Sequence, residues 1–271
     1  MALRIMNNVA ATFAQRQLSI NSNNLSRSLE KLSSGYRINR ASDDAAGLSV
    51  SERMRFQISG MQQAMKNTMD GISLAQVAEG GLQNLCSILQ RMRVLSLQAS
   101  NGTLSSSDRS LITEEVNQLI SEIDRMQTAV SFNGVSLLGS AQSIQIQVGA
   151  SAGQQISIVL SSITASGLGI NTLDVSSATN AATAVSSIDS ALSSVLSLRA
   201  KLGAAQNRME KTYDYIAIQR ENLMAAESRI RDVDFAEEMT NYTKNQILMQ
   251  ASTAMLSQAN VSVQAVLQLL S

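Results

Sequence analysis

Apolar side chains recur at alternating intervals of three and four residues near both ends of this sequence, and no proline interrupts them. The first run comprises Leu18, Ser22, Leu25, Leu29, Leu32 and Tyr36. The second comprises Ala75, Ala78, Leu82, Leu85, Leu89, Met92, Ser96 and Ala99. This spacing is typical of helices that pack along a heptad seam. Because proline breaks helix interiors, its absence from all 271 residues favours long helices.

Two further runs extend the pattern. One comprises Ile112, Val116, Leu119, Ile123, Met126 and Val130. The other passes from Ile188 to Leu223 and is interrupted by Arg199, Gln206 and Arg220. These polar residues either lie at the edges of the seam or fix its register at some cost in stability. From Asn245 onward the apolar face broadens, and no charged side chain follows Lys244, which predicts burial against partners.

The middle of the sequence has a different pattern. Ile144, Ile146 and Val148 alternate with polar residues, and Ile156, Ile158 and Leu160 do so after a glycine-containing loop. This arrangement predicts a β-hairpin, and Asn133-Gly134 predicts a further turn. Ser, Thr, Ala and Gly dominate the rest, so this zone is either an uncharged, loop-rich surface or an exposed tip that carries O-linked sugars. The sequence therefore predicts a mostly α-helical, elongated coiled-coil bundle of paired N- and C-terminal segments, with a small β-hairpin region in the middle.

Composition argues against catalysis. The sequence has no histidine and a single cysteine, Cys86, which excludes His-dependent triads and four-cysteine zinc sites. The adjacent carboxylates Asp43-Asp44 and Glu237-Glu238 point in different directions on a helix. No glycine motif for phosphate binding is present. We therefore expect no enzyme activity, no cofactor and no metal.

The charge and the hydropathy of the sequence limit the classes of partner that the chain is expected to bind. The formal net charge is +0, from 21 basic and 21 acidic residues, so no nucleic-acid footprint is indicated and self-association is permitted. No stretch is apolar for long enough to predict a transmembrane helix. The first 17 residues do not resemble a cleavable secretory signal. We expect neither nucleic acid nor membrane as a partner.

Long stretches near both ends resemble the terminal signatures of bacterial flagellin. They are residues 32–48, LSSGYRINRASDDAAGL; 227–238, ESRIRDVDFAEE; and 247–260, ILMQASTAMLSQAN. Residues 132–138, FNGVSLL, resemble the segment that follows the third N-terminal helix of that family. The resemblance covers roughly residues 1–140 and 185–271. The chain is therefore similar to a short flagellin that lacks the large outer domains.

The resemblance implies a filament subunit for swimming motility. Residues 1–42 with 232–271 would form the inner coiled-coil domain, 43–140 with 183–231 the helical bundle, and 141–182 a short outer β and loop region. The self-assembly seam would comprise Leu18, Leu25, Leu29, Leu32, Leu248, Met255, Val266 and Leu269. Relatives commonly have proline at the place of Val263, so the last helix is expected to continue without a break there.

The resemblance also implies partners and a location. The chain would polymerise with itself in the extracellular filament after unfolded export through the flagellar type III pathway, without a cleaved signal. A chaperone would hold the C-terminal region, and filament cap and hook-junction proteins would be further partners. The termini are expected to be disordered in the monomer and to fold on assembly.

A vertebrate innate immune receptor is a further implied partner. Arg91, Leu95 and Glu115 match the receptor-facing positions of the family, and Val94 replaces the usual acidic residue. The same three residues could instead be ordinary helix-surface or seam residues. Two alternative functions stay open at this point. They are a hook-filament junction protein of the same superfamily, and a secreted adhesin or immune-receptor ligand.

Overall fold

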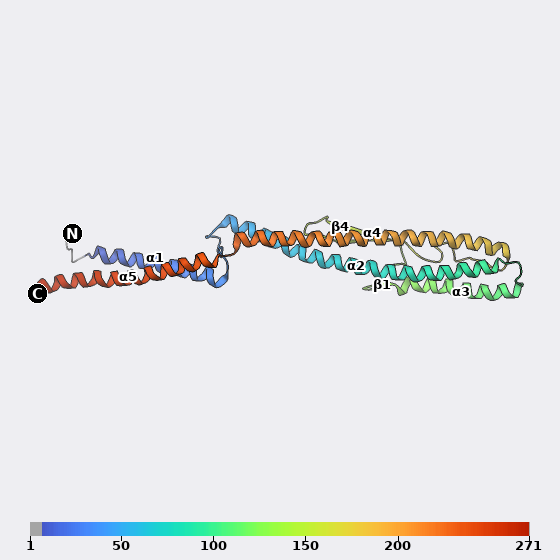
Figure 1. Ribbon diagram of the computed structural model, residues 1–271, viewed down its shortest axis with the longest axis horizontal. Helices are drawn as coiled ribbons and strands as arrows, with labels where there is room; N and C mark the ends of the chain where they lie inside the picture. Colours follow the sequence, from blue (N-terminus) through green and yellow to red (C-terminus); the bar gives the residue numbers. More distant parts are fainter. Residues whose placement is uncertain (1–6, 271) are drawn as a thin grey trace. The chain divides into compact units, whose positions relative to one another are not determined.

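The computed structural model describes residues 7–270, with side chains described through residue 262. Its elements are α1 (Val9–Ser34), α2 (Ala45–Ala99), α3 (Ser106–Ala129), β1 (Ser131–Phe132), β2 (Val135–Ser136), β3 (Gln142–Gln147), β4 (Gln155–Leu160), α4 (Ala178–Arg231) and α5 (Phe235–Leu270). The predicted mostly helical fold with a small central β region is confirmed (Figure 1).

The chain divides into two compact units, which we call the terminal unit and the central unit. The terminal unit contains the residues up to Phe56 and those from Asn222 onward, and the central unit is Gln57–Glu221. Helices α2 and α4 each continue through a boundary between the units without a break. Neither boundary therefore coincides with a loop.

An apolar core formed by the seams predicted for α2, α3 and α4 holds the central unit together. All eight α2 positions from Ala75 to Ala99 named above are buried, as are Ile188, Val195 and Leu202 of α4. Three ion pairs join α2 to its neighbours. Arg91 pairs with Glu115 of α3. Arg93 pairs with Asp189 of α4, and Glu79 pairs with Arg199 of α4. The interrupting residues Arg199, Gln206 and Arg220 are half-buried, as expected at the edge of a seam.

Hydropathy alone would allow α4 to cross a membrane. By length and composition it is the one helix among the described residues that could do so, although a buried core helix of a soluble protein meets the same criterion. This differs from the sequence-based expectation that no such segment exists. The buried positions of Ile188, Val195 and Leu202 identify α4 as a core helix of the central unit.

Both predicted turns of the β region are present. Strands β3 and β4 pair antiparallel with Ile144 opposite Ile158 and Ile146 opposite Ile156. The short β1–β2 hairpin turns through Asn133 and Gly134, whose φ angles of 48° and 80° are both positive, as a tight two-residue hairpin turn requires. The hairpin prediction is confirmed because the predicted apolar residues lie at alternate strand positions on one face, while Val159 between two of them is exposed. Ile156, Ile158 and Leu160 of that face are buried.

Two glycines of α2 allow the larger hairpin to approach this helix closely. A Cβ on Gly60 would lie 2.9 Å from the Cβ of Ala150, in the β3–β4 loop. A Cβ on Gly71 would lie 3.1 Å from a side-chain carbon of Ile146 in β3. Both glycines provide space for the hairpin, which packs along α2.

Candidate functional site: the terminal helix pair

Helices α1 and α5 pack side by side in opposite directions (Figure 1). Polar contacts join them at three levels. Near one end, Asn8 Nδ2 donates to the Ala259 carbonyl oxygen at 3.1 Å. In the middle, Asn21 Nδ2 donates to Ser252 Oγ at 3.0 Å. Near the other end, Lys31 Nζ lies 3.6 Å from a carboxylate oxygen of Glu238.

The contact face of α1 is less apolar than the sequence suggested. Its buried residues are Ala14, Asn21 and Ser28, one heptad apart. The predicted seam residues Leu18, Leu25 and Leu32 are half-buried and lie beside this row. Ser22 and Leu29, which were expected in the seam, are exposed, and Leu29 has 56% of its surface accessible. The predicted row of Ser22 and Leu29 is therefore displaced by one residue, to Asn21 and Ser28, because the helix buries small and polar side chains.

The contact face of α5 is displaced in the same way. Its buried and half-buried residues alternate by four and three: Glu238, Tyr242, Asn245, Met249, Ser252, Leu256 and Ala259. The predicted seam residues Leu248 and Met255 each precede a member of this row and are exposed, Met255 to 65%. The side chains of Val263, Val266 and Leu269 lie outside the described residues.

Large apolar side chains cover the outside of the pair. The exposed set comprises Val9, Phe13, Ile20, Leu29, Phe235, Met239, Ile247, Leu248, Met255 and Val261. An open groove along α5 is lined by Met239, Thr240, Thr243, Lys244, Ile247 and Leu248. Exposed apolar surface of this extent is characteristic of protein interaction sites.

A clasp joins the two connections at the base of the pair. The Val233 N–H donates to the Gly35 carbonyl at 3.0 Å, and the Arg37 N–H donates to the Arg231 carbonyl at 2.7 Å. The Arg231 guanidinium lies over the Tyr36 ring, 4.7 Å from its centroid. Gly35 adopts a φ of 75°, which closes α1 in a left-handed cap.

An ion pair completes this clasp. Arg231 donates from Nη1 to Glu52 Oε1 at 2.6 Å. This hydrogen bond lowers the pKa of the Glu52 carboxyl below its ordinary value. Sequence reasoning missed the clasp because its residues are widely separated along the chain and share no local pattern.

The three residues matched to the immune-receptor contact lie together in the central unit, on α2 and α3. Arg91 donates from Nε to Glu115 Oε1 at 2.8 Å, and both side chains are exposed. Leu95 is only 2% exposed and belongs to the core of the unit. Its neighbours Val94 and Leu97 are the apolar side chains that reach the surface here.

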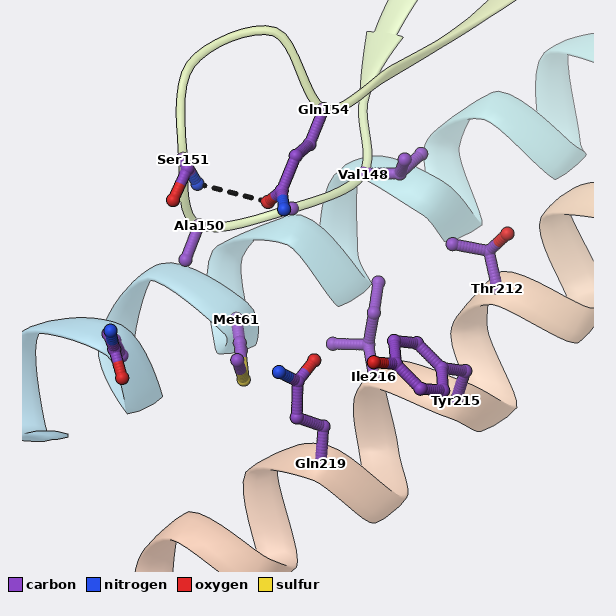
Figure 2. Close-up of a pocket in the computed structure, with 11 residues that line it drawn as sticks. Met61, Val148, Ala150, Ser151, Gln154, Thr212, Tyr215, Ile216 and Gln219 are labelled. Atoms are coloured by element: carbon purple, nitrogen blue, oxygen red, sulfur yellow. Dashed lines mark hydrogen bonds between the residues drawn. The ribbon is translucent and has the colours of Figure 1, made fainter.

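A cavity of about 270 Å³ lies between α2, the β3–β4 loop and α4 (Figure 2). Met61, Ile216 and Tyr215 line its floor together with glutamine side chains. The loop above it is closed by the Ser151 N–H, which donates to Gln154 Oε1 at 3.2 Å. No charged residue lines this cavity, so it holds no acid–base pair. Within the described part of the chain, no cluster of three potential metal ligands occurs, and Cys86 is buried.

Comparisons with known proteins identify the family. Residues 5–143 match the bacterial flagellin N-terminal helical region, and residues 185–270 match the bacterial flagellin C-terminal helical region. The chain belongs to the bacterial flagellin family. It is 48% identical to a flagellin of Halalkalibacterium halodurans, over 98% of this chain and 99% of that protein. It is 46% identical to a Bacillus subtilis flagellin, over 99% and 100%.

Other relatives and solved structures agree. The flagellar filament 30.7 kDa core protein of Treponema maltophilum is 46% identical over 98% of this chain and 99% of that protein. The crystal structure of Bacillus cereus flagellin aligns with a TM-score of 0.50 at 31% identity, over 60% of this chain and 94% of that one. A putative flagellar hook-associated protein from Vibrio parahaemolyticus aligns with a TM-score of 0.59, over 70% and 100%, at 15% identity, which shows the fold alone.

Family membership establishes the general role of the chain. This flagellin is a structural subunit that polymerises with itself into the extracellular flagellar filament, and the family is not enzymatic. The chain spans nearly all of each flagellin compared above.

Proposed function

We propose that the terminal helix pair is the polymerisation surface of this flagellin. The observation that carries the proposal is that polar side chains are buried inside the pair and apolar ones are exposed outside it. Asn21, Ser28 and Ser252 are buried, whereas Leu29 and Met255 are exposed. A helix pair of this kind needs further copies to cover its apolar exterior. Leu18, Leu25 and Leu32 would support the surface from its edge, and Leu248 would belong to it. Residues 1–42 with 232–271 would then form the inner domain of the filament.

The rest of the chain would form the outer layers. We assign residues 43–140 with 183–231 to the helical bundle and 141–182 to a short outer region, without large outer domains. The central zone is rich in exposed Ser and Thr, so O-linked sugars could be attached there. Mass spectrometry of filaments from the native host would detect them as mass additions on peptides from residues 141–182.

Reassembly tests the polymerisation surface. Purified filaments are dissociated, reseeded and inspected for micrometre filaments by electron microscopy. Ile247→Lys places a charge on the exposed apolar face and should abolish elongation. Gln246→Lys adds the same charge at the neighbouring exposed polar position and should elongate like the unaltered chain. Normal elongation of the Ile247→Lys variant would contradict the proposal.

We also propose that the pair becomes stable only on assembly and that the chain is exported unfolded, without cleavage, through the flagellar type III pathway. A chaperone would hold the uncharged, apolar C-terminal segment before export. The small and polar seam supports this, since it contributes little burial to an isolated pair. Hydrogen exchange should show weak protection of residues 18–36 in dilute monomer and strong protection in filaments. Strong protection in the monomer would refute coupled folding and assembly.

Further partners follow from the same role. The filament cap would bind the growing end, and a hook-junction protein would bind the base. Both contacts would use the surface by which copies of this chain bind one another. The alternative in which this chain is itself a junction protein has the shared fold as its support, whereas flagellins match it from end to end.

The Arg91–Glu115 pair is our proposed contact for a vertebrate innate immune receptor. Both side chains are exposed and could form charge-assisted hydrogen bonds. Leu95 is buried, so it would position α2 instead of contacting the receptor directly. Arg91→Ala should reduce receptor activation by monomer in a reporter-cell assay. Arg55→Ala, at another exposed α2 arginine, should leave activation unchanged, and an undiminished signal from Arg91→Ala would exclude this contact.

A further inference from the structure

A hydrogen-bonded polar layer lies inside the terminal helix pair, where a coiled coil usually has leucine. Asn21 is 3% exposed, and its Nδ2 donates to Ser252 Oγ at 3.0 Å and to the Leu248 carbonyl at 3.4 Å. Ser252 is also buried, and its Oγ donates to the Leu248 carbonyl at 2.7 Å. The Nδ2 group of the asparagine amide therefore donates to the opposite helix, while its Oδ1 accepts from Gln17 Nε2 on the same helix at 3.4 Å.

The neighbouring layers complement this one. One heptad further along α1 is Ser28, and the corresponding position on the antiparallel α5 is Asn245. One heptad in the other direction, Ala14 corresponds to Ala259. In this register these three layers, one heptad apart, hold serine with asparagine, asparagine with serine, and two alanines, and half-buried Leu18 and Leu25 of α1 lie between them.

A shift of one heptad destroys this complementarity. In one direction Asn21 would lie opposite Asn245, and two amides would occupy the space of an amide and a hydroxyl. In the other direction it would lie opposite Ala259, and a buried amide would lose its partner. Such a shift moves the helices past each other by ~10 Å. A seam of leucines would tolerate it better, since a buried asparagine is what fixes register in a coiled coil.

We propose that Asn21 and Ser252 set the axial register of α1 against α5 and thereby determine which surface the subunit presents during assembly. The inference rests on the proposed role of the pair as the polymerisation surface. The exposed apolar rows of the two helices, with Leu29 on one and Met255 on the other, keep fixed relative heights only while the register holds. Every copy then presents the same surface to its neighbours.

Distances between spin labels in assembled filaments test this proposal. Gln15 and Asn241 are exposed positions on α1 and α5, and both are replaced by labelled cysteine in a Cys86→Ala chain. Labelled subunits are diluted into unlabelled subunits of the same variant, and distances are measured by pulsed electron paramagnetic resonance. The chain with Asn21 intact should give one distance. Asn21→Leu should add a population displaced along the helix axis by ~10 Å.

A control separates register from stability. Ala14→Gly lowers the helical stability of α1 at a buried position of the same row. Because it removes no hydrogen-bond partner, it should keep the single distance. This control is measured in the same filaments and with the same labels as the test variant.

The outcomes distinguish this proposal from the one on which it rests. A single, unshifted distance for Asn21→Leu would overturn the register role. If that variant does not polymerise, Ser252→Ala removes the Oγ acceptor and is judged by the same criterion. If the chain with Asn21 intact gives no defined distance in filaments, the pairing of α1 with α5 in the polymer is itself wrong.

Discussion

Leu29 offers a quantitative test of how the terminal helix pair is used. Complete burial of a leucine side chain contributes about 1.5–3 kcal/mol, and 56% of the Leu29 surface is exposed in the single chain. If a neighbouring copy covers that surface, Leu29→Ala removes about 1 kcal/mol from each subunit addition, because alanine retains only the first carbon. Since ~1.4 kcal/mol corresponds to a factor of ten in an equilibrium constant, the critical concentration for polymerisation should rise about fivefold.

The assay is a sedimentation titration of seeded filaments, with the soluble concentration measured at equilibrium. Ser33→Ala, at an exposed polar position of the same helix, should leave the critical concentration unchanged. Leu29→Ala should also leave the unfolding free energy of the monomer within about 0.5 kcal/mol, as for an exposed position. A critical concentration within a factor of about 1.5 of the unaltered value would show that no neighbour covers Leu29 and would refute the reasoning.

Other predictions concern stability in dilute monomer. Leu89→Ala, at a fully buried α2 position, should lower the unfolding free energy of the central unit by about 2.7–5 kcal/mol. Leu97→Ala, at a position 58% exposed on the same helix, should change it by less than about 0.5 kcal/mol. Thermal unfolding followed by circular dichroism compares the two variants. Gly60→Ala should destabilise that unit by about 1–3 kcal/mol in urea titration, because the added Cβ displaces the hairpin loop. The hydrogen bond from Arg231 holds the pKa of the Glu52 carboxyl below its ordinary 4.5. The contact therefore stabilises the folded chain above pH 4.5, and this stabilisation is lost as the pH falls through the lowered pKa. Glu52→Gln should remove that pH-dependent part of the stability from the acid-unfolding curve.

The central unit could be predicted from the sequence because its core follows a simple rule: regularly spaced apolar side chains are buried inside the unit that carries them. Each of the eight α2 positions expected in the seam is buried, from Ala75 to Ala99. The β3–β4 hairpin was equally readable, since its apolar residues alternate along both strands and face one side. In both places hydrophobic side chains are buried by the same chain that carries them.

The terminal unit departs from that rule in an instructive way. Leu29 and Met255 were expected in the seam, whereas the helices bury Ser28 and half-bury Leu256 beside them. A pattern reports which side chains will leave water, and it does not report whether the same chain or another copy will cover them. The clasp of Tyr36, Glu52 and Arg231 was unpredictable for a different reason, since contacts between distant segments have no signature in local spacing.

The polar seam and the apolar exterior of the terminal pair have a joint consequence for stability. Ordering α1 alone fixes 26 residues, each at a conformational cost of roughly 1–2 kcal/mol. The residues that α1 buries, Ala14, Asn21 and Ser28, return little hydrophobic stabilisation against that cost. Moving the leucines inward would strengthen the isolated pair, but it would remove those side chains from the surface that neighbours cover. It would also replace the layer of Asn21 and Ser252 that distinguishes one register from the next. A subunit whose terminal helices gain their stability from neighbours therefore couples folding to assembly, and its weak seam is part of that coupling.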